Sequence, residues 1–187
     1  INMRSLVMVK QEINLQNKKI KIGVLGGSFD PAHKGHLAIS KEAKKRIKLK
    51  KVIWAITKKN PFKKEIKTSV KERIKHCKKI IGANSFIEVK FYENIIKSNK
   101  TINLINHLKK NKSIEIYFLM GADNLIHFHK WHKFKSISQK CNILVFDRHG
   151  YKKNSLKSKT FKQLSKDNLE FIEFNKVNIS SSQLRKI

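Results

Sequence analysis

The chain has 187 residues, of which 40% are hydrophobic, and it carries a formal net charge of +30 at pH 7. This length is sufficient for one domain with a sizeable core. There is no run of about 18 apolar residues, and the first residues lack the apolar segment of a secretory signal. We therefore expect neither a transmembrane helix nor a cleaved leader.

The positive charge has two interpretations. A chain with 43 Lys and Arg residues against 13 Asp and Glu has the charge to bind nucleic acid or another polyanion. However, Lys greatly outnumbers Arg, and the lysines are spread over the whole sequence. This pattern is typical of a compositional bias rather than of one dedicated binding surface. We therefore expect no specific nucleic-acid partner and no membrane partner.

The two cysteines are far apart and do not form a metal-binding motif. Cys77 and Cys141 lack the C-x-x-C spacing of a zinc site, and each is predicted to be a small buried hydrophobic residue. Two thiols in a chain of this size favour a reducing compartment, so we expect a cytoplasmic location. The sequence does not distinguish a monomer from an oligomer.

Short runs rich in β-branched residues alternate with longer helix-like stretches along the chain. Residues 1–18 are polar and mixed, so we expect a loose N-terminal extension there, followed by one domain over 19–187. The predicted strands are IKIGVLG from Ile20, KVIWAIT from Lys51, SFIEVKF from Ser85, SIEIYFLM from Ser113, CNILVFD from Cys141 and LEFIEF from Leu169. The predicted helices lie near 35–47, 69–81, 101–110, 123–138 and 157–165. The Lys- and Ser-rich stretch 151–159 is predicted to be a surface loop.

This alternation predicts a single α/β domain with a doubly wound, mostly parallel sheet that helices cover on both faces. In sheets of this kind, ligands bind beyond the carboxyl ends of the strands, at the point where the strand order reverses. The residues directly after each strand are therefore the candidates for function.

The stretch GVLGGSFDPAHKGH, residues 23–36, runs from the first predicted strand to the start of the next predicted helix. Gly26 and Gly27 lack a Cβ atom, so we expect the backbone to turn there and to approach a ligand closely. Asp30-Pro31 is a turn signal. The spacing of the glycines matches neither the dinucleotide-binding G-x-G-x-x-G fingerprint nor the P-loop.

His33 and His36 lie where the next helix is expected to begin. A helix N-terminus gathers unpaired N–H groups and the positive end of the helix dipole, and both favour phosphate. Histidine adds donors that can be charged when a polyanion binds. A triphosphate is therefore the expected ligand, against the alternative of a turn with two surface histidines.

The segment GGSFDPAHKGH resembles the G-G-x-F-D-P-x-H-x-G-H signature of the nucleotidyltransferase superfamily with the H-x-G-H motif. Within it, the chain is similar to the bacterial nicotinate-nucleotide adenylyltransferases, from about Lys19 to Arg185. Further motifs occur in the family's order: GAD at Gly121–Asp123, KWHKF at Lys130–Phe134, DRHG at Asp147–Gly150 and ISSSQLR at Ile179–Arg185. The resemblance implies a Rossmann-like fold.

The last of these motifs has a physical interpretation of its own. Ser180, Ser181 and Ser182 are of the type that caps helix N-termini, so a helix is predicted to begin there and to offer a second anion site. Arg185 lies one turn further on, where a guanidinium can bind phosphate in a forked geometry. A plain capped helix is the alternative. The family usually continues beyond this motif, whereas this sequence stops at Ile187, so we expect a C-terminal tail that is short or truncated.

The resemblance implies adenylyl transfer from ATP to nicotinate mononucleotide in NAD biosynthesis, with pyrophosphate released. Mg²⁺ would arrive with ATP, and no residues are assigned as a protein metal site. The implied catalytic residues are His33 and His36. The implied ATP-binding residues are Gly26, Gly27, Ser28, Phe29, His33, His36, Lys63, Gly121, Asp123, Ser180, Ser181, Ser182 and Arg185. The implied acceptor-binding residues are Thr101, Trp131 and Arg148.

The chain departs from the family's pattern near two of these residues. Phe62, next to Lys63, stands where the family usually has histidine. Asn103 and Leu104, just after Thr101, replace an acid and a threonine. These departures concern residues beside the expected site rather than the histidine motif.

Several alternatives stay open. Pantetheine-phosphate adenylyltransferase shares the glycine-rich start, although it usually has threonine at the position of His33 and lacks the GAD and tryptophan segments. A basic nucleic-acid-binding protein would explain the charge but not the histidine motif. Arg73 either matches a family arginine or is a charge on a helix surface. His127, His129 and His132 offer a metal site as an alternative, although no acid lies at ligand spacing on the same face.

Overall fold

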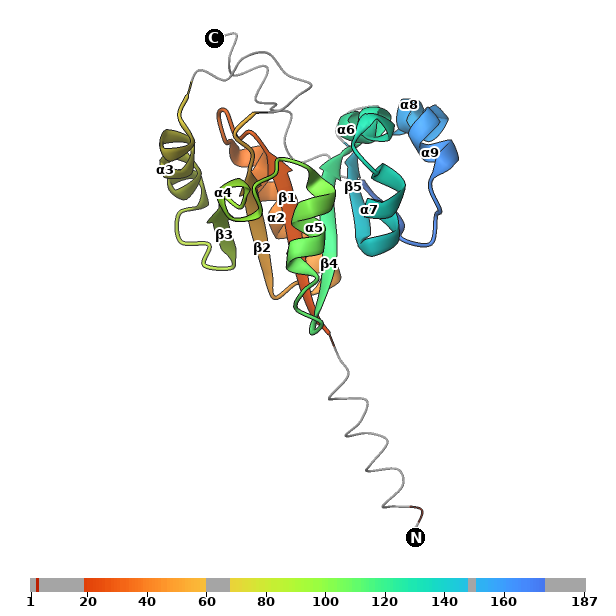
Figure 1. Cartoon of the computed structure of the whole chain (residues 1–187), viewed down its shortest axis with the longest axis horizontal. Coiled ribbons are helices and arrows are strands. Elements are labelled where there is room, and N and C mark those ends of the chain that lie inside the picture. Colours follow the sequence, from red (N-terminus) through yellow and green to blue (C-terminus); the bar gives the residue numbers. More distant parts are fainter. Residues whose placement is uncertain (1–2, 4–18, 60–67, 148–150, 174–187) are drawn as a thin grey trace.

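The computed structural model describes residues 3, 19–59, 68–147 and 151–173. Within them six parallel strands form one sheet in the order β3-β2-β1-β4-β5-β6 (Figure 1). The strands are β1 (Ile20–Gly27), β2 (Lys51–Ile56), β3 (Ile87–Lys90), β4 (Ile114–Gly121), β5 (Asn142–Asp147) and β6 (Leu169–Glu173). All six lie where the sequence predicts strands, and the doubly wound α/β fold is confirmed. The expectations for the N-terminal extension and the C-terminal tail concern residues that, apart from Met3, lie outside the described ranges.

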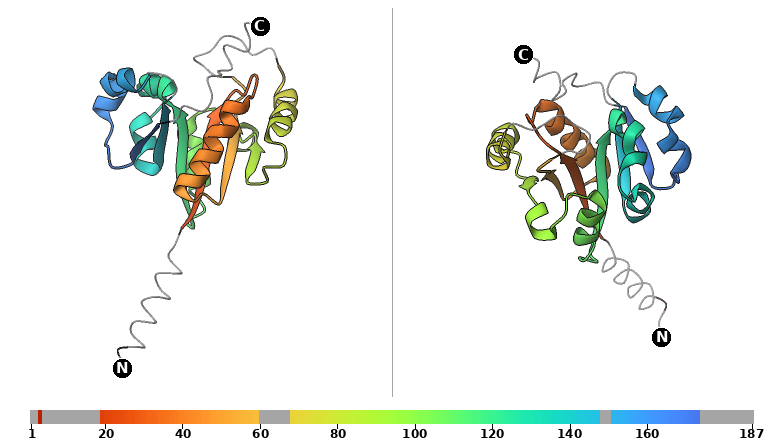
Figure 2. Two further views of the ribbon diagram at one scale, coloured as in Figure 1. Left: turned by 180° about the vertical axis from the view of Figure 1, so that it is seen from behind. Right: turned by 45° about the horizontal axis from the view of Figure 1, so that its top comes forward.

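Helices cover both faces of the sheet. They are α2 (Lys34–Ile47), α3 (Val70–Ile81), α4 (Glu93–Ile96), α5 (Thr101–Leu108), α6 (Ala122–His127), α7 (Phe134–Lys140), α8 (Tyr151–Lys157) and α9 (Lys159–Gln163), with a 3₁₀ turn, η1 (Phe128–Lys130). In Figure 1, α5 lies in front of the sheet, and the left panel of Figure 2 shows α2 on the opposite face. None of the described helices has the length and apolar character needed to span a membrane.

The sheet divides the core into two layers. On one face, strand residues such as Ile22 and Val24 pack with residues of α5, α6 and α7. On the other face, Leu25, Val52 and Trp54 pack with residues of α2 and α3. Successive side chains of a strand point to opposite faces, so a strand covered on both faces carries a continuous apolar run. This is why β2 and β5 read as VIWAI and ILVF in the sequence.

Trp54 joins β2 to α2 through two hydrogen bonds. Its Nε1 atom donates to Ser40 Oγ over 2.9 Å, and the Ser40 hydroxyl donates to the carbonyl oxygen of His36 over 2.8 Å. The side chains of Trp54 and Ser40 are both fully buried. A buried indole N–H needs an acceptor, and Ser40 supplies it from the second turn of the helix that begins beside the two histidines.

The structure differs from the single helix predicted over 123–138. Here α6, η1 and α7 are separate short elements, because Trp131 has an extended backbone (φ −76°, ψ 141°) and Lys133 a left-handed one (φ 53°). The ring of Trp131 packs edge-on against Phe128 and Phe118, with centroids 5.1 and 6.0 Å away. The contact with Phe118 of β4 is not visible in the local pattern of the sequence.

The prediction of a surface loop over 151–159 is wrong. These residues form α8 and the start of α9, and Ser158 Oγ caps α9 by accepting a hydrogen bond from the Phe161 N–H. Ser155 is fully buried and donates to the Lys152 carbonyl oxygen. A Lys- and Ser-rich stretch can be helical once tertiary contacts cover one of its faces. The short helix α4 was likewise not predicted.

Cys77 and Cys141 are free and buried, as predicted. Burial raises the pKa of each thiol to about 12. Both thiols are therefore protonated at neutral pH, and they act as packing groups rather than as nucleophiles.

Replacing Ser40 with Ala tests the buried link between β2 and α2. We expect the free energy of unfolding to fall by about 1–3 kcal/mol, since the Trp54 N–H loses its acceptor inside the core. Urea unfolding followed by circular dichroism measures this change. Ser165→Ala, at an exposed position, is the control and should change the free energy by about 0.5 kcal/mol or less. Equal stabilities for the two variants would contradict the assignment.

Candidate active site

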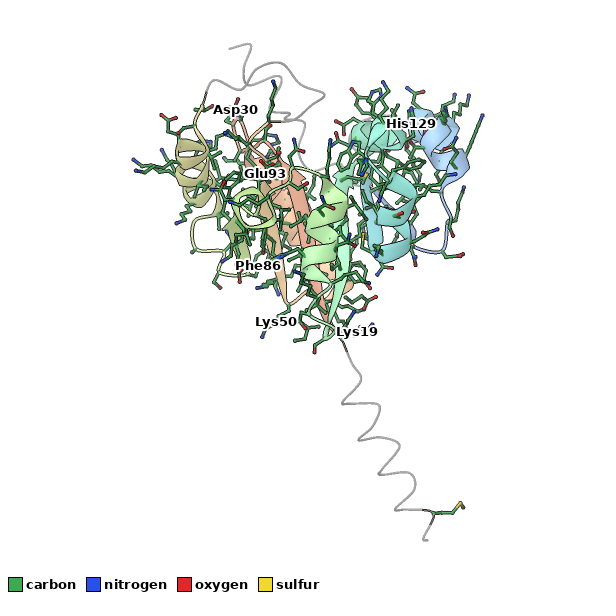
Figure 3. The ribbon with its side chains drawn as sticks, viewed as in Figure 1. Lys19, Asp30, Lys50, Phe86, Glu93 and His129 are labelled. Carbon is green, nitrogen blue, oxygen red and sulfur yellow. The ribbon has the colours of Figure 1, made fainter. Side chains whose placement is uncertain are left out.

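A cleft of about 560 Å³ opens at the carboxyl ends of β1, β2 and β4. The strand order reverses at β1, because β2 lies on one side of it and β4 on the other. The cleft therefore occupies the switch point at which open α/β sheets bind ligands. Figure 3 shows Asp30, Glu93 and His129 at this end of the molecule, with Lys19 and Lys50 at the opposite end.

The cleft brings together most of the predicted site residues from segments far apart in the sequence. Those that line it are Gly26, Gly27, Ser28, Phe29, His33, His36, Thr101, Gly121, Asp123 and Trp131. The others, Lys63, Arg148, Ser180, Ser181, Ser182 and Arg185, lie outside the described residues. Their roles stay predictions.

The turn after β1 is not made by the glycines, contrary to expectation. Strand β1 continues through Gly26 and Gly27, and neither residue has a positive φ. The chain instead turns at Phe29, which has φ 49°, and at the Asp30-Pro31 peptide. The glycines contribute by their lack of side chains at the floor of the cleft, where a Cβ atom on Gly26 would lie 3.5 Å from the Phe118 ring.

The two histidines form the cap of α2. His33 is the N-cap residue with an extended backbone, and its Nδ1 atom accepts a hydrogen bond from the Gly35 N–H over 3.1 Å. His36 lies in the first turn, and its Nδ1 atom accepts from the His33 N–H, also over 3.1 Å. The two rings are in contact, with centroids 3.9 Å apart. The pair thus satisfies two of the N–H groups that a helix start leaves without intrahelical partners.

This cap determines which ring atoms carry protons. A nitrogen that accepts a hydrogen bond has no proton of its own, so each neutral imidazole carries its proton on Nε2. In this arrangement each ring presents an Nε2–H donor beside the positive end of a 14-residue helix. That the rings can be charged when a polyanion binds stays a prediction.

Aromatic rings support His36 from behind. Phe29 lies 4.9 Å from the His36 ring and stacks on Trp54, with centroids 5.1 Å apart and an interplanar angle of 14°. Phe29 and Trp54 are both buried. The imidazole of His36 is thus held between the helix cap and a rigid apolar wall, which limits its rotation.

The far wall of the cleft comes from α5 and from the turn after η1. Thr101 is the first residue of α5, and Trp131 is the residue directly after η1. Leu104, a departure from the family's pattern, lines the same wall and packs against the core. Asn103, the other departure, is exposed and donates a hydrogen bond from Nδ2 to Ser98 Oγ over 2.8 Å. In this chain Asn103 therefore stabilises the start of α5.

The sequence did not predict two residues of functional interest, Glu93 and Tyr92, and it left the role of Arg73 undecided. Glu93 lines the cleft and accepts hydrogen bonds from the Thr57 hydroxyl and the Lys58 N–H. Tyr92 also lines it, and burial together with the charge of Glu88 raises the pKa of its hydroxyl. Arg73 is only 2% exposed, which excludes the interpretation of a helix-surface charge. The sequence contains no signal for Glu93, because α4 is too short to show a helical pattern.

The histidine-rich region does not form a metal centre among the described residues, where no group of three or more His, Cys, Asp or Glu side chains could hold an ion. His129 has a structural role. Its N–H donates to the Thr160 hydroxyl, and its Nδ1 atom lies 3.0 Å from the same oxygen. This contact ties η1 to α9 and supports the segment that carries Trp131. His127 and His132 are exposed.

Known proteins share both the sequence and the fold. A family model described as cytidylyltransferase-like matches residues 24–187. A probable nicotinate-nucleotide adenylyltransferase of Pelagibacter ubique is 68% identical over 180 residues, which cover 96% of this chain and 100% of that protein. A protein of the same description from Aliarcobacter butzleri is 34% identical and covers 89% of this chain and 86% of its own length.

Among solved structures, the nicotinic acid mononucleotide adenylyltransferase of Plasmodium falciparum complexed with NaAD superposes with a TM-score of 0.74. It is 21% identical and covers 89% of this chain and 82% of its own, and at this identity the likeness concerns the fold alone. The family assignment instead rests on relatives that match nearly the whole length. By these relatives and by its cleft, the chain belongs to the nicotinate-nucleotide adenylyltransferase family of nucleotidyltransferases.

Proposed function

We propose that this protein transfers the adenylyl group of ATP to the phosphate of nicotinate mononucleotide, forming nicotinate adenine dinucleotide and pyrophosphate. The observation that carries the proposal is the pair of histidines that cap the start of α2. They line the cleft at the switch point of the sheet. The reaction is a step of NAD biosynthesis. We assign it to the cytoplasm, in keeping with two free, buried thiols.

The chemistry requires no general base. A phosphate oxygen of the acceptor attacks the α-phosphorus of ATP, and the bond from that phosphorus to the bridging oxygen breaks. The electron pair of this bond leaves with pyrophosphate. Because the attacking phosphate is already an anion, catalysis consists of positioning and of charge stabilisation.

His33 and His36 stabilise the charge that develops at the transferred phosphorus. Their Nε2–H groups donate to oxygens of the α-phosphate and of the triphosphate, and the N-terminus of α2 adds the field of its dipole. These donors are fixed before substrate binds, so little reorganisation accompanies the reaction.

The leaving pyrophosphate is held from the opposite side. In this proposal Lys63, the N–H groups of Ser180–Ser182 and the guanidinium of Arg185 bind it. Asp123, which lines the cleft, accepts a hydrogen bond from a ribose hydroxyl. Mg²⁺ would enter with the ATP substrate and would neutralise negative charge on its phosphates, and no residue of the chain is assigned to hold it.

The acceptor occupies the wall formed by α5 and η1. Trp131 lines the cleft and forms T-shaped contacts with Phe118 and Phe128, and in this proposal its indole stacks on the nicotinate ring. Thr101, at the start of α5, and Arg148 complete the acceptor site.

Identification of the product tests the proposed function. The protein is incubated with ATP and Mg²⁺ and, in separate reactions, with nicotinate mononucleotide, nicotinamide mononucleotide or phosphopantetheine, and the products are identified by mass. We expect nicotinate adenine dinucleotide and one equivalent of pyrophosphate. If phosphopantetheine were adenylylated and nicotinate mononucleotide were not, the proposed acceptor would be wrong, although the assignment to the superfamily would still hold.

Replacing either His33 or His36 with Ala tests the catalytic pair. We expect turnover to fall by about 10²–10³-fold in each variant, because a donor to the transition state is lost. Steady-state kinetics measures the change, and circular dichroism verifies the fold. His127→Ala is the matched control, since His127 is exposed and lies on α6. Near-normal turnover of the folded His36→Ala variant would contradict a catalytic role and would show that His36 only caps the helix.

Replacing Arg185 with Ala tests the opposite side of the proposed triphosphate site. We expect the affinities for ATP and pyrophosphate to fall by about 1.5–3 kcal/mol, since a charge-assisted contact is lost. Arg185→Lys should restore part of this, because a point charge does not reproduce the guanidinium fork. Calorimetry with nicotinate mononucleotide alone should show unchanged affinity. An equal loss for ATP and acceptor would contradict a local role.

A further inference from the structure

Arg73 is a buried cation that holds main-chain segments together. It lies in the first turn of α3 and is 2% exposed. Its Nη1 atom donates to the carbonyl oxygens of Ser28 and Thr57 over 2.6 and 2.8 Å. Its Nη2 and Nε atoms donate to the carbonyl oxygens of Lys58 and Thr68 over 3.3 and 3.2 Å. One guanidinium therefore gathers carbonyl groups from three separate segments.

The segments joined in this way form the end of the cleft. Ser28 comes directly after β1, Thr57 comes directly after β2, and both residues line the cleft. Burial lowers the pKa of Arg73, and the negative charge of Asp30 opposes that shift. Four hydrogen bonds in diverging directions require the planar fork of a guanidinium, which an ammonium group does not reproduce.

The loop 28–32, which leads from β1 into the cap of α2, is anchored to the surroundings of α3 at further points. His76 Nε2 donates to the Ala32 carbonyl oxygen over 3.0 Å, and the Thr68 hydroxyl donates to the Asp30 carboxylate. Arg73 connects the loop to the sheet, because it donates hydrogen bonds to the carbonyl oxygen of Ser28, at the start of the loop, and to that of Thr57, directly after β2. The loop ends at His33, the N-cap residue.

We propose that Arg73 is a positioning residue for adenylyl transfer. Its guanidinium fixes the loop 28–32 against the end of β2 and thereby determines where the Nε2–H donors of His33 and His36 lie. The proposal rests on the proposed function of the histidine pair. Arg73 acts through the backbone of the loop, so it affects turnover rather than binding of the acceptor.

Steady-state kinetics of Arg73→Lys and Arg73→Gln is the first part of the test. We expect turnover at saturating substrates to fall by about 10–100-fold, because small displacements of catalytic donors have effects of this size. The KM for nicotinate mononucleotide should change by about threefold or less. Lysine keeps the charge but not the fork, so Arg73→Lys should be impaired as well. Full turnover in the folded variants would overturn the proposal.

A double-mutant cycle separates positioning from a general loss of stability. If Arg73 acts through the histidines, adding Arg73→Gln to His36→Ala should cost much less than Arg73→Gln costs alone. Ile81→Ala is the stability control, because Ile81 is buried at the opposite end of α3. All variants are compared at a temperature at which circular dichroism shows them folded. Additive losses, or an equal loss in Ile81→Ala, would contradict the proposal.

Nitrogen NMR of the histidine rings gives a readout that does not depend on catalysis. We expect the wild-type spectrum to show His33 and His36 as Nε2–H tautomers, assigned from the spectra of the two Ala variants. In Arg73→Gln the signals should move toward the average of the two tautomers, whereas Ile81→Ala should leave them unchanged. An unchanged spectrum in Arg73→Gln overturns the proposal even if the protein were to adenylylate another acceptor. Failure to form dinucleotide with a shifted spectrum would refute the proposed function alone.

Discussion

The Nδ1 atoms of His33 and His36 accept the N–H groups that the start of α2 leaves without intrahelical partners, and the candidate site depends on these two hydrogen bonds. Ser, Thr or Asp would cap a helix equally well, but ionised Asp has no donor, and in Ser or Thr the acceptor and the donor share one oxygen atom. Histidine has two ring nitrogens on opposite sides of the ring. One nitrogen can accept a hydrogen bond from the backbone while the other donates a hydrogen bond to a ligand. The same side chain can therefore cap a helix and take part in a binding site.

The two rings can present donors in a fixed direction only if their positions are fixed. Residues of β2, α2 and α3 fix them from different sides. Behind the pair, Phe29 stacks on Trp54, and Ser40 connects that indole to the carbonyl group of His36. Beside the loop, α3 contributes the Arg73 guanidinium. α3 is itself well defined at its start, where Ser69 and Glu72 form a reciprocal capping box. The geometry of the histidine pair is thus set by packing and main-chain hydrogen bonds with residues of β2, α2 and α3.

The large net charge contributes little to this architecture. Ion pairs such as Arg46–Glu42 and Lys152–Glu173 lie at the surface, where such pairs contribute about 0–1 kcal/mol. By contrast, Arg73 is a buried cation with four hydrogen bonds to carbonyl oxygens. The location of a charge, and not the total of +30, determines its structural effect. A buried charge is stable only where dipoles surround it.

The sequence by itself determined the strands and the class of fold, because the apolar runs of strands buried on both faces are local and continuous. It also located the glycine-rich strand end and the histidine pair, since both lie in one continuous motif between the first strand and the next helix. Helix boundaries that depend on local caps, such as the start of α3 after Ser69, were predictable for the same reason. These features are all set by neighbours along the chain.

Only the tertiary structure decided features that depend on distant contacts. At the break of the helix, the Trp131 ring packs against Phe118 of β4, and the helix over 151–157 contacts α6. The roles of Arg73 and Glu93 depend on carbonyl, hydroxyl and N–H groups of other segments, which a sequence pattern does not reveal. The protonated nitrogen of each histidine was likewise undecided until the acceptor role of Nδ1 was known. The physical reason is common to all of them: hydrogen bonds and packing between segments form only when the strands align side by side.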